Sequence, residues 1–303
     1  MLWTRSIFKM RATSFVLLAL ASVGFSFPAA PSPIQARQEQ QTDLAPQQGL
    51  SAWAKGATTE WQIHSSCNAS EARQLRQGLA EAVELAGHAS EHILRWGNSS
   101  EIYQKYFGDA PTGEAIGFLE KIASGDRGGV LFRCDNPDGN CALEGWGGHW
   151  RGENATGETV ICPLSYETRR SLLQMCALGY TVSGSESNTF WASDLMHRLY
   201  HMPAFGEGAV EHLTEGYADV LEMVDEGNTT MLTRDSDTLQ YFALEAYAHD
   251  IAVPGKGCPG NVTESHDDEP AASTATTGGA PVSTTASAPA ECHTHSDGDV
   301  HCE

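Results

Sequence analysis

The chain has 303 residues and a formal net charge of −21, with 39 Asp and Glu against 18 Lys and Arg. Nucleic-acid binding needs clustered basic side chains, so this balance excludes nucleic acid as a partner. The same charge suits an exported protein that attracts cations, and the part able to pack, roughly 200 residues, suits a single domain.

The first 27 residues predict a signal peptide. Arg5, Lys9 and Arg11 precede the apolar stretch 12–27, which is too short to span a bilayer comfortably. Residues 28–60 are rich in Gln, Pro and Ala and indicate a linker or propeptide. The sequence contains no second membrane segment and no apolar C-terminal tail. We therefore expect a secreted protein, extracellular or associated with the cell wall, without a membrane span.

Residues 61–260 predict one α+β domain that is mostly helical with a small sheet. One apolar stripe at helical spacing predicts a helix ending at Gly97, and it comprises Leu75, Leu79, Ala82, Ala86 and Ile93. Short β-type runs cover 130–134 and 158–162. Further helices are expected over 166–178, 190–202, 210–224 and 237–251, the last with Ser236 as its N-cap.

Eight cysteines and five glycosylation sequons agree with export. Six of the cysteines should form three disulfides in an oxidising compartment: Cys67, Cys134, Cys141, Cys162, Cys176 and Cys258. The connectivity stays open, but Cys134 and Cys141 flank an Asn-Pro-Asp-Gly turn and are the preferred local pair. A thiolate zinc cluster is the alternative, which the absence of CxxC spacing disfavours. The sequons are Asn68, Asn98, Asn154, Asn228 and Asn261.

Two histidine pairs have the i, i+4 spacing that puts both imidazoles on one face of a helix. His88 and His92 lie opposite the apolar stripe of their helix, which predicts a solvated face. His197 and His201 lie in a strongly apolar helix, where buried imidazoles need a metal ion or hydrogen-bond partners. We therefore predict His197 and His201 as zinc ligands, with satisfied core histidines as the alternative.

The string HRLYH at 197–201, the run from Arg133 to Trp150 and the His/Cys-rich tail together resemble the fungal pH-regulated antigen family. These secreted HRxxH-domain proteins are known as zincophores and include an Aspergillus allergen. The family is similar to deuterolysin-type zinc metalloproteases, so the resemblance implies a zincin-like fold over 61–260. It also implies zinc capture, delivery to a cell-surface zinc transporter, and immune evasion through binding of host complement regulators and matrix proteins.

Position 198 decides between a zinc enzyme and a zinc binder. Enzymes with an HExxH motif use its glutamate as the general base on zinc-bound water. Here that position is Arg198, whose guanidinium accepts no proton. We therefore expect a zinc-sequestering protein. An active deuterolysin-type metalloendopeptidase, with a base such as Glu211 or Glu215, is the alternative, and an adhesion protein with a structural metal is a third reading.

The third zinc ligand is left open by the sequence. The deuterolysin context Gly-Thr-x-x-Asp-x-x-Tyr-Gly is missing from this chain. His212 is the first choice, followed by Glu215 and then Asp219. Asp194 lies three residues before His197 and is either the group that orients that imidazole or an exposed helix acid.

The last part of the chain divides into a tether and a metal-binding tail. Residues 261–290 are rich in Ser, Thr, Ala, Gly and Pro and have few large apolar side chains to offset their ordering entropy, so we expect disorder. Residues 291–303 follow, with histidines and cysteines that could close a zinc site: Cys292, His293, His295, His301 and Cys302. A Cys292–Cys302 disulfide with exposed histidines is the alternative, and the two are compatible.

Overall fold

The computed structural model describes residues 53–260, 292–294 and 300–302. The chain divides into two compact units, Met1–Lys55 and Gly56–Glu303, and almost all described residues belong to the second. The α-helices of this unit are α3 (Ala69–Trp96), α4 (Glu101–Phe107), α5 (Thr112–Ser124), α6 (Pro163–Thr168), α7 (Trp191–Tyr200), α8 (Pro203–Gly206), α9 (Gly216–Asp225), α10 (Thr229–Leu232) and α11 (Ser236–Tyr247). The short helical turns of the unit are η1 (Gly97–Ser99), η2 (Asn140–Ala142), η3 (Gly152–Asn154), η4 (Leu172–Gln174), η5 (Ser187–Thr189) and η6 (Ala248–Ala252).

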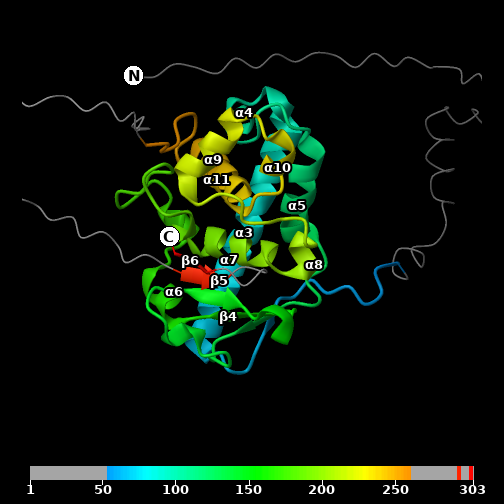
Figure 1. Ribbon diagram of the computed structural model, residues 1–303, viewed down its shortest axis with the longest axis vertical. Helices are drawn as coiled ribbons and strands as arrows, with labels where there is room; N and C mark the ends of the chain where they lie inside the picture. The colour runs from blue at the N-terminus through cyan, green and yellow to red at the C-terminus, as the bar shows by residue number, and fades with distance from the viewer. Residues whose placement is uncertain (1–52, 261–291, 295–299, 303) are drawn as a thin grey trace, which may run out of the picture. The chain divides into compact units, whose positions relative to one another are not determined.

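A small mixed sheet lies against one end of the helices (Figure 1). Its strand order is β1-β2-β4-β3, with β1 (Gln62–Ile63), β2 (Leu131–Arg133) and β4 (Glu158–Ile161) parallel. The edge strand β3 (Gly148–Trp150) pairs antiparallel with β4, with His149 opposite Val160. Helices with a small sheet confirm the α+β class expected from the sequence.

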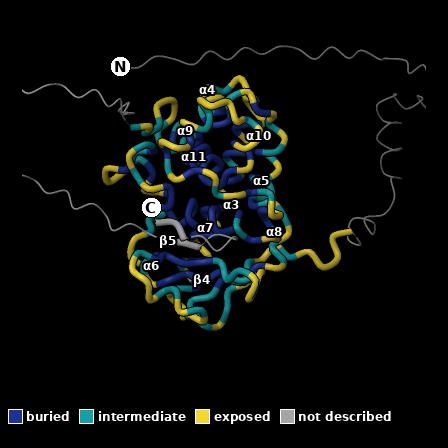
Figure 2. The backbone as a smooth tube through the Cα atoms, viewed as in Figure 1, coloured by how far each residue is buried: buried dark blue, intermediate teal, exposed yellow. Residues whose placement is uncertain are grey.

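Helix α3 is the central element, and its boundaries follow from its sequence. The Asn68 side chain accepts hydrogen bonds from the first turn, and the Glu71 carboxylate accepts one from the Asn68 backbone amide, which is a capping box. The predicted apolar stripe is buried throughout. It packs against α5, α7 and α11 and forms the middle of the hydrophobic core (Figure 2). This scaffold holds the neighbouring helix α7 in one position.

Helix α7 carries the HRLYH string, and each of its ten residues is buried. It approaches α3 closely because Gly78 of α3 has no side chain. A β-carbon at Gly78 would meet Trp191 and Leu195 of α7 at 2.8 and 2.9 Å, well inside normal contact. The predicted start near Phe190 and end before Pro203 agree with the observed helix within two residues. Its side chains are therefore fixed by packing before any ligand binds.

Three disulfides join the six domain cysteines, as predicted, but their pairing corrects the sequence-based preference. The bonds are Cys67–Cys134, Cys141–Cys162 and Cys176–Cys258. The preferred local pair Cys134–Cys141 is therefore wrong. Cys134 follows β2, where the parallel strand β1 brings the segment containing Cys67 alongside it. Sheet pairing, rather than the turn between the two cysteines, selects the partner.

Two of the predicted helices differ from the structure. The segment 166–178 is interrupted, because Arg170 forms a bridge with Phe190, and Glu81 accepts hydrogen bonds from Ser171 and Leu172. The helix expected over 210–224 begins only at Gly216. In both places a long-range polar contact holds the backbone extended against its local helical preference.

Candidate metal centre

Helix α7 directs two imidazoles at each other. The Nε2 atoms of His197 and His201 lie 3.0 Å apart. Two nitrogens bound to one tetrahedral zinc ion at about 2.0–2.1 Å would be about 3.3 Å apart. The pair is therefore already close to the separation that a shared zinc ion requires.

His212 reaches the same place from a different segment. Its segment is held by backbone hydrogen bonds, from the Glu211 amide to the Arg234 carbonyl and from the Ser236 amide to the Glu211 carbonyl. The Asp235 carboxylate, which caps α11, also accepts hydrogen bonds from the amides of Leu213 and Thr214. The N-cap is thus Asp235, and the predicted cap Ser236 is wrong. These bonds explain why 210–215 is extended and why His212 lies beside α7.

The three imidazoles form one compact group. One ligand atom from each of His197, His201 and His212 lies within 4.8 Å of the other two. The His212 side chain is 2% exposed and His197 is also buried. Within the described residues, no carboxylate joins this group. Three imidazoles are a donor set that zinc commonly takes in proteins.

Helix α11 supplies the groups behind the imidazoles, which the sequence did not reveal. Gln240 Oε1 lies 3.2 Å from His197 Nδ1, the ring nitrogen that faces away from His201. Asp237 Oδ1 lies 3.6 Å from His197 Nδ1 and 3.4 Å from His212 Nε2. Asp237 is fully buried, and this oxygen has no hydrogen-bond partner among the residues that the structure describes. A buried carboxylate that faces two imidazoles favours a cation bound by them.

Arg198, at the position where an HExxH protease has its catalytic glutamate, is held by Asp194. Arg198 forms a two-point ion pair with Asp194, at 2.9 and 3.0 Å. Arg169 contacts the same carboxylate at 2.9 Å. Burial alone would raise the pKa of Asp194, but the two guanidinium groups hold it below its ordinary value. The Arg198 side chain also lies under the edge strand, since a β-carbon at Gly148 would collide with it.

This network corrects both sequence-based readings of Asp194. It is neither the group that orients His197 nor an exposed acid, because it is 3% exposed and bound to Arg169 and Arg198. Arg198 therefore joins α7 to the sheet, and it shares the Asp194 carboxylate with Arg169.

The other predicted ligands fall outside the group of three histidines. Glu215 is the exposed N-cap residue of α9, and Asp219 lies one turn into that helix, where it accepts a bond from the Glu215 amide. Glu211 is exposed as well. Of the tail, the structure describes β5 (Cys292–Thr294) and β6 (Val300–Cys302), antiparallel strands in which Cys292 is opposite Cys302 and His293 opposite His301. His295 lies outside the described residues.

The second histidine pair is not the solvated pair that its position predicted. His92 is 5% exposed, and its Nδ1 lies 2.6 Å from Asp250 Oδ2. His88 lies 3.1 Å from the same oxygen, and His249 lies 2.9 Å from the other. Asp250 reaches α3 from η6, a contact that the periodicity of α3 alone does not reveal.

Comparison with known proteins identifies the family of this chain. The family model described as "HRXXH: Putative peptidase family" matches residues 14–261. The chain belongs to this HRXXH family. It is 54% identical to the major allergen Asp f 2 of Aspergillus fumigatus over 95% of this chain and 97% of that protein. It is 59% identical to Antigen 1 of Emericella nidulans over 79% and 87% of the two chains.

A more distant member comes from a yeast. The pH-regulated antigen PRA1 of Candida albicans is 45% identical over 70% of this chain and 69% of that protein. Among solved structures, a zinc peptidase from Grifola frondosa aligns with 60% of this chain and 99% of its own, at 13% identity and a TM-score of 0.44. Membership of the HRXXH family rests on the sequence matches.

Proposed function

We propose that this HRXXH-family chain is a secreted zinc-sequestering protein whose domain binds zinc through His197, His201 and His212. The observation that carries the proposal is the convergence of three imidazoles from two separate segments, backed by the buried carboxylate of Asp237. Zinc at this site would be a bound cargo held by neutral imidazoles, and these residues supply no proton acceptor of the HExxH type.

The position of Arg198 supports binding rather than hydrolysis. Its guanidinium is held by Asp194 under the sheet edge and can accept no proton from a zinc-bound water. General-base catalysis is typically worth about 10²–10⁴-fold in rate. A hydrolase at this centre would need a base other than residue 198, and the carboxylate described against the imidazoles, Asp237, is fully buried and faces His197 Nδ1 and His212 Nε2.

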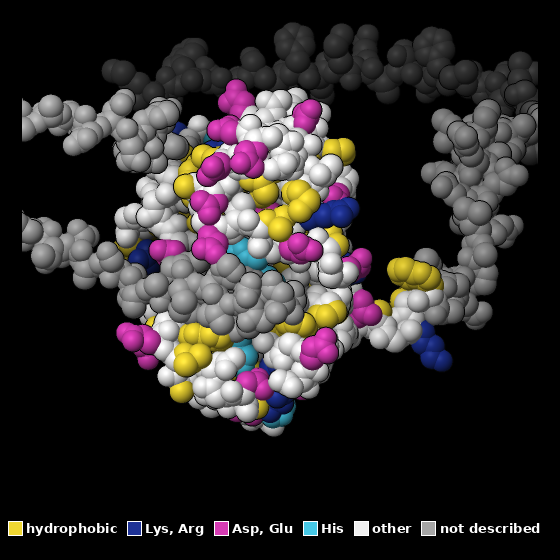
Figure 3. All heavy atoms as spheres, in the orientation of Figure 1, with side chains coloured by type: hydrophobic (Ala, Val, Ile, Leu, Met, Phe, Trp, Pro, Cys, Tyr) yellow, Lys and Arg dark blue, Asp and Glu magenta, His cyan; other side chains and the backbone are white. Residues whose placement is uncertain are grey.

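The acidic surface supports a role in collecting cations. Asp and Glu side chains are spread over the face seen in Figure 3, where Lys and Arg side chains are few. The net charge of −21 raises the local concentration of Zn²⁺ near the molecule. We propose that the tail residues from Cys292 to Cys302 form a second zinc site. From there the protein would deliver zinc to a cell-surface transporter.

Secretion and glycosylation complete the proposal. Three disulfides suit an oxidising compartment. The described asparagines of the sequons are all exposed, at positions 68, 98, 154 and 228. No helix in the described ranges is both long and apolar enough to cross a membrane. We further propose that the protein binds host proteins such as complement regulators, a role suggested by its antigen and allergen relatives.

Metal content by elemental analysis tests the proposal directly. The full chain is compared with His197→Ala, and with a tail variant in which His293, His295 and His301 are replaced by Ala. His197→Ala should lose the zinc ion of the domain and keep the zinc bound by the tail. The tail variant should lose the tail zinc and keep the zinc ion of the domain. A wild-type protein that carries no zinc at neutral pH would refute zinc sequestration.

A peptidase assay on the zinc-loaded chain separates the binder from the endopeptidase. We expect no cleavage of a denatured protein substrate by the wild type. Cleavage that disappears in His197→Ala would establish the endopeptidase instead.

A further inference from the structure

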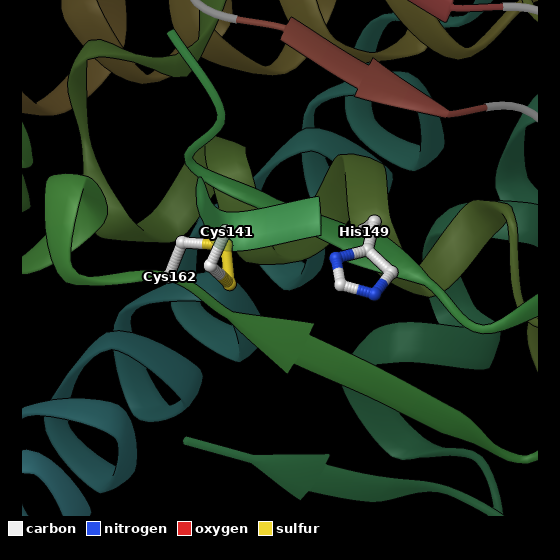
Figure 4. A group of neighbouring side chains, drawn as sticks. All are labelled: Cys141, His149 and Cys162. Atoms are coloured by element: carbon white, nitrogen blue, oxygen red, sulfur yellow. A yellow bond between two sulfur atoms is a disulfide. The ribbon is translucent and has the colours of Figure 1, made fainter. Parts of the chain in front are cut away.

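A second group of metal-binding side chains lies at the edge of the sheet. One ligand atom from each of Cys141, His149 and Cys162 lies within 4.8 Å of the other two. Cys141 is in η2, His149 in the edge strand β3, and Cys162 follows β4 (Figure 4). The two cysteines are joined as a disulfide, and a ring nitrogen of His149 faces it. Neither the centre on α7 nor the tail includes these residues.

The imidazole of His149 is arranged as a metal ligand would be. It is 1% exposed, and its Nε2 lies 3.0 Å from Asp138 Oδ2. Arg151 donates two hydrogen bonds to the same carboxylate, at 2.8 and 3.0 Å, so Asp138 acts as a hydrogen-bond acceptor toward the imidazole as well. The hydrogen of His149 must therefore be on Nε2 and point at Asp138. Nδ1 is left with a bare lone pair.

That lone pair has no partner. Nδ1 of His149 is buried and makes no hydrogen bond in the part of the chain that the structure describes. A buried acceptor without a partner destabilises the fold, so such atoms are rare in folded proteins. A carboxylate on one ring nitrogen and a metal on the other is a common arrangement at zinc sites. Here the second nitrogen faces the Cys141 and Cys162 sulfur atoms.

We infer that Cys141, Cys162 and His149 form a latent zinc site, which opens when a thiol reduces the disulfide between the two cysteines. The two thiolates and the imidazole would supply three ligands of a tetrahedral ion, and a water molecule would supply the fourth. Because two thiolates neutralise one Zn²⁺, the buried site would carry no net charge, which avoids the cost of burying an isolated charge.

The backbone geometry suits both forms of the pair. The Cα atoms of Cys141 and Cys162 are 5.3 Å apart. Two thiolates bound to one zinc ion at about 2.3 Å have sulfur atoms about 3.8 Å apart. Rotation of the two side chains about their Cα–Cβ bonds is enough to pass from the bonded pair to that separation. The strands β3 and β4 that flank the site need not move.

The opening step is a balanced thiol–disulfide exchange. A thiolate of a small thiol attacks Sγ of Cys141, which is more exposed than the fully buried Cys162. The bond between the cysteines breaks, and the Cys162 sulfur leaves and takes up a proton. A second thiolate attacks the sulfur of the attached thiol, which frees Cys141 and yields the oxidised small disulfide. Zn²⁺ then displaces two protons from the two cysteine thiols.

Cobalt(II) titration of the reduced full chain tests the inference, because thiolate-to-cobalt charge-transfer absorption appears only when sulfur binds the metal. The tail thiols are removed by Cys292→Ser and Cys302→Ser, and a water-soluble phosphine reduces the protein without adding a competing thiolate. We expect the sulfur band to reach a plateau at one cobalt ion per chain. The oxidised protein should show none.

His149→Gln in the same background is the decisive variant, because it leaves every disulfide intact during folding. We expect the affinity of the sulfur site for cobalt to fall by more than about 100-fold, and by about 10–100-fold in Asp138→Asn. The inference is wrong if reduction gives no sulfur band, if His149→Gln leaves the band unchanged, or if the helical circular dichroism is lost before the band appears. His197→Ala should leave this band as it is, which separates the result from the proposed function.

Discussion

Two pairs of histidines in this chain have identical spacing and opposite surroundings. His197 and His201 on α7 point their Nε2 atoms at each other, and the third imidazole, His212, lies beside them. His88 and His92 on α3 both point at one oxygen of Asp250. The nitrogens of the first pair can bind one common metal ion. In the second pair, one nitrogen of each ring already contacts the Asp250 carboxylate.

The difference shows that i, i+4 spacing places two imidazoles on one face of a helix, while the segment packed against that face determines whether they can bind a metal ion or contact a carboxylate instead. The extended segment with His212 and the start of α11 with Asp237 lie opposite α7, so the carboxylate lies behind the imidazoles. Opposite α3 stands η6, which places Asp250 directly between the rings. A carboxylate behind an imidazole strengthens a metal ligand, and one in front of it replaces the metal.

The largest expected effect is the loss of a ligand on α7. A structural zinc site is worth about 10–16 kcal/mol, so one of its few ligands contributes about 4 kcal/mol. His197→Ala should therefore weaken zinc binding at the domain site by about a thousandfold, measured by competition with a chelator. The matched variant His88→Ala should leave zinc affinity unchanged. If His197→Ala and His88→Ala lost zinc affinity equally, the distinction drawn between the two histidine pairs would be wrong.

Acidification should weaken zinc binding at the α7 centre. Each coordinating imidazole must release its proton, and the ordinary histidine pKa is about 6.5. We expect zinc affinity at the α7 centre to fall by more than about 100-fold between pH 7.5 and 5.5, measured by calorimetry. Circular dichroism should show an intact fold over this range. Zinc affinity that stays constant would argue against ligation by histidine.

A smaller effect is expected from the carboxylate behind the ligands. Asp237→Asn keeps the shape of the side chain and removes the charge that faces His197 and His212. Loss of such a partner typically weakens metal binding about 10–100-fold. Asp219→Asn on the exposed side of α9 is the matched control and should leave zinc affinity unchanged. If Asp237→Asn bound zinc as tightly as the wild type, Asp237 would not contribute to zinc binding.

The sequence predicted what depends on local pattern. The stripe of α3, the boundaries of α7 and the strands β2 and β4 follow from periodicity and turn residues, and the i, i+4 spacing of His197 and His201 placed two imidazoles on one face. The family resemblance, which the HRXXH match confirms, then favoured zinc. His212 was the first choice for the third ligand, and the structure brings it to the pair.

What the sequence missed depends on contacts between distant segments. Asp237 and Gln240 lie about forty residues after His197, and nothing in the pattern of α11 marks them as facing an imidazole. Asp194 was misread because its partner Arg169 lies 25 residues away. The histidines of α3 were misread for the same reason, since Asp250 lies 158 residues beyond His92.

The smallest expected effect concerns the stability of that second group. Burial alone would raise the pKa of Asp250, but hydrogen bonds from His249, His92 and His88 hold it below its ordinary value. A lowered carboxyl pKa contributes stability that is present above the unfolded value, about 3.9, and is lost as the pH falls through the folded value. Asp250→Asn should therefore lower the unfolding free energy by about 1–3 kcal/mol at pH 7.

Denaturant unfolding at pH 7 and near pH 3 measures this loss, which should shrink at the lower pH because the wild-type carboxyl is then also taking up its proton. Glu91→Gln, an exposed change on the same helix as His88 and His92, is the control and should have little effect at either pH. Zinc affinity should equal that of the wild type in both variants. If Asp250→Asn instead weakened zinc binding at α7, the two groups would be coupled, and the carboxylate would not be a purely structural substitute for a metal ion.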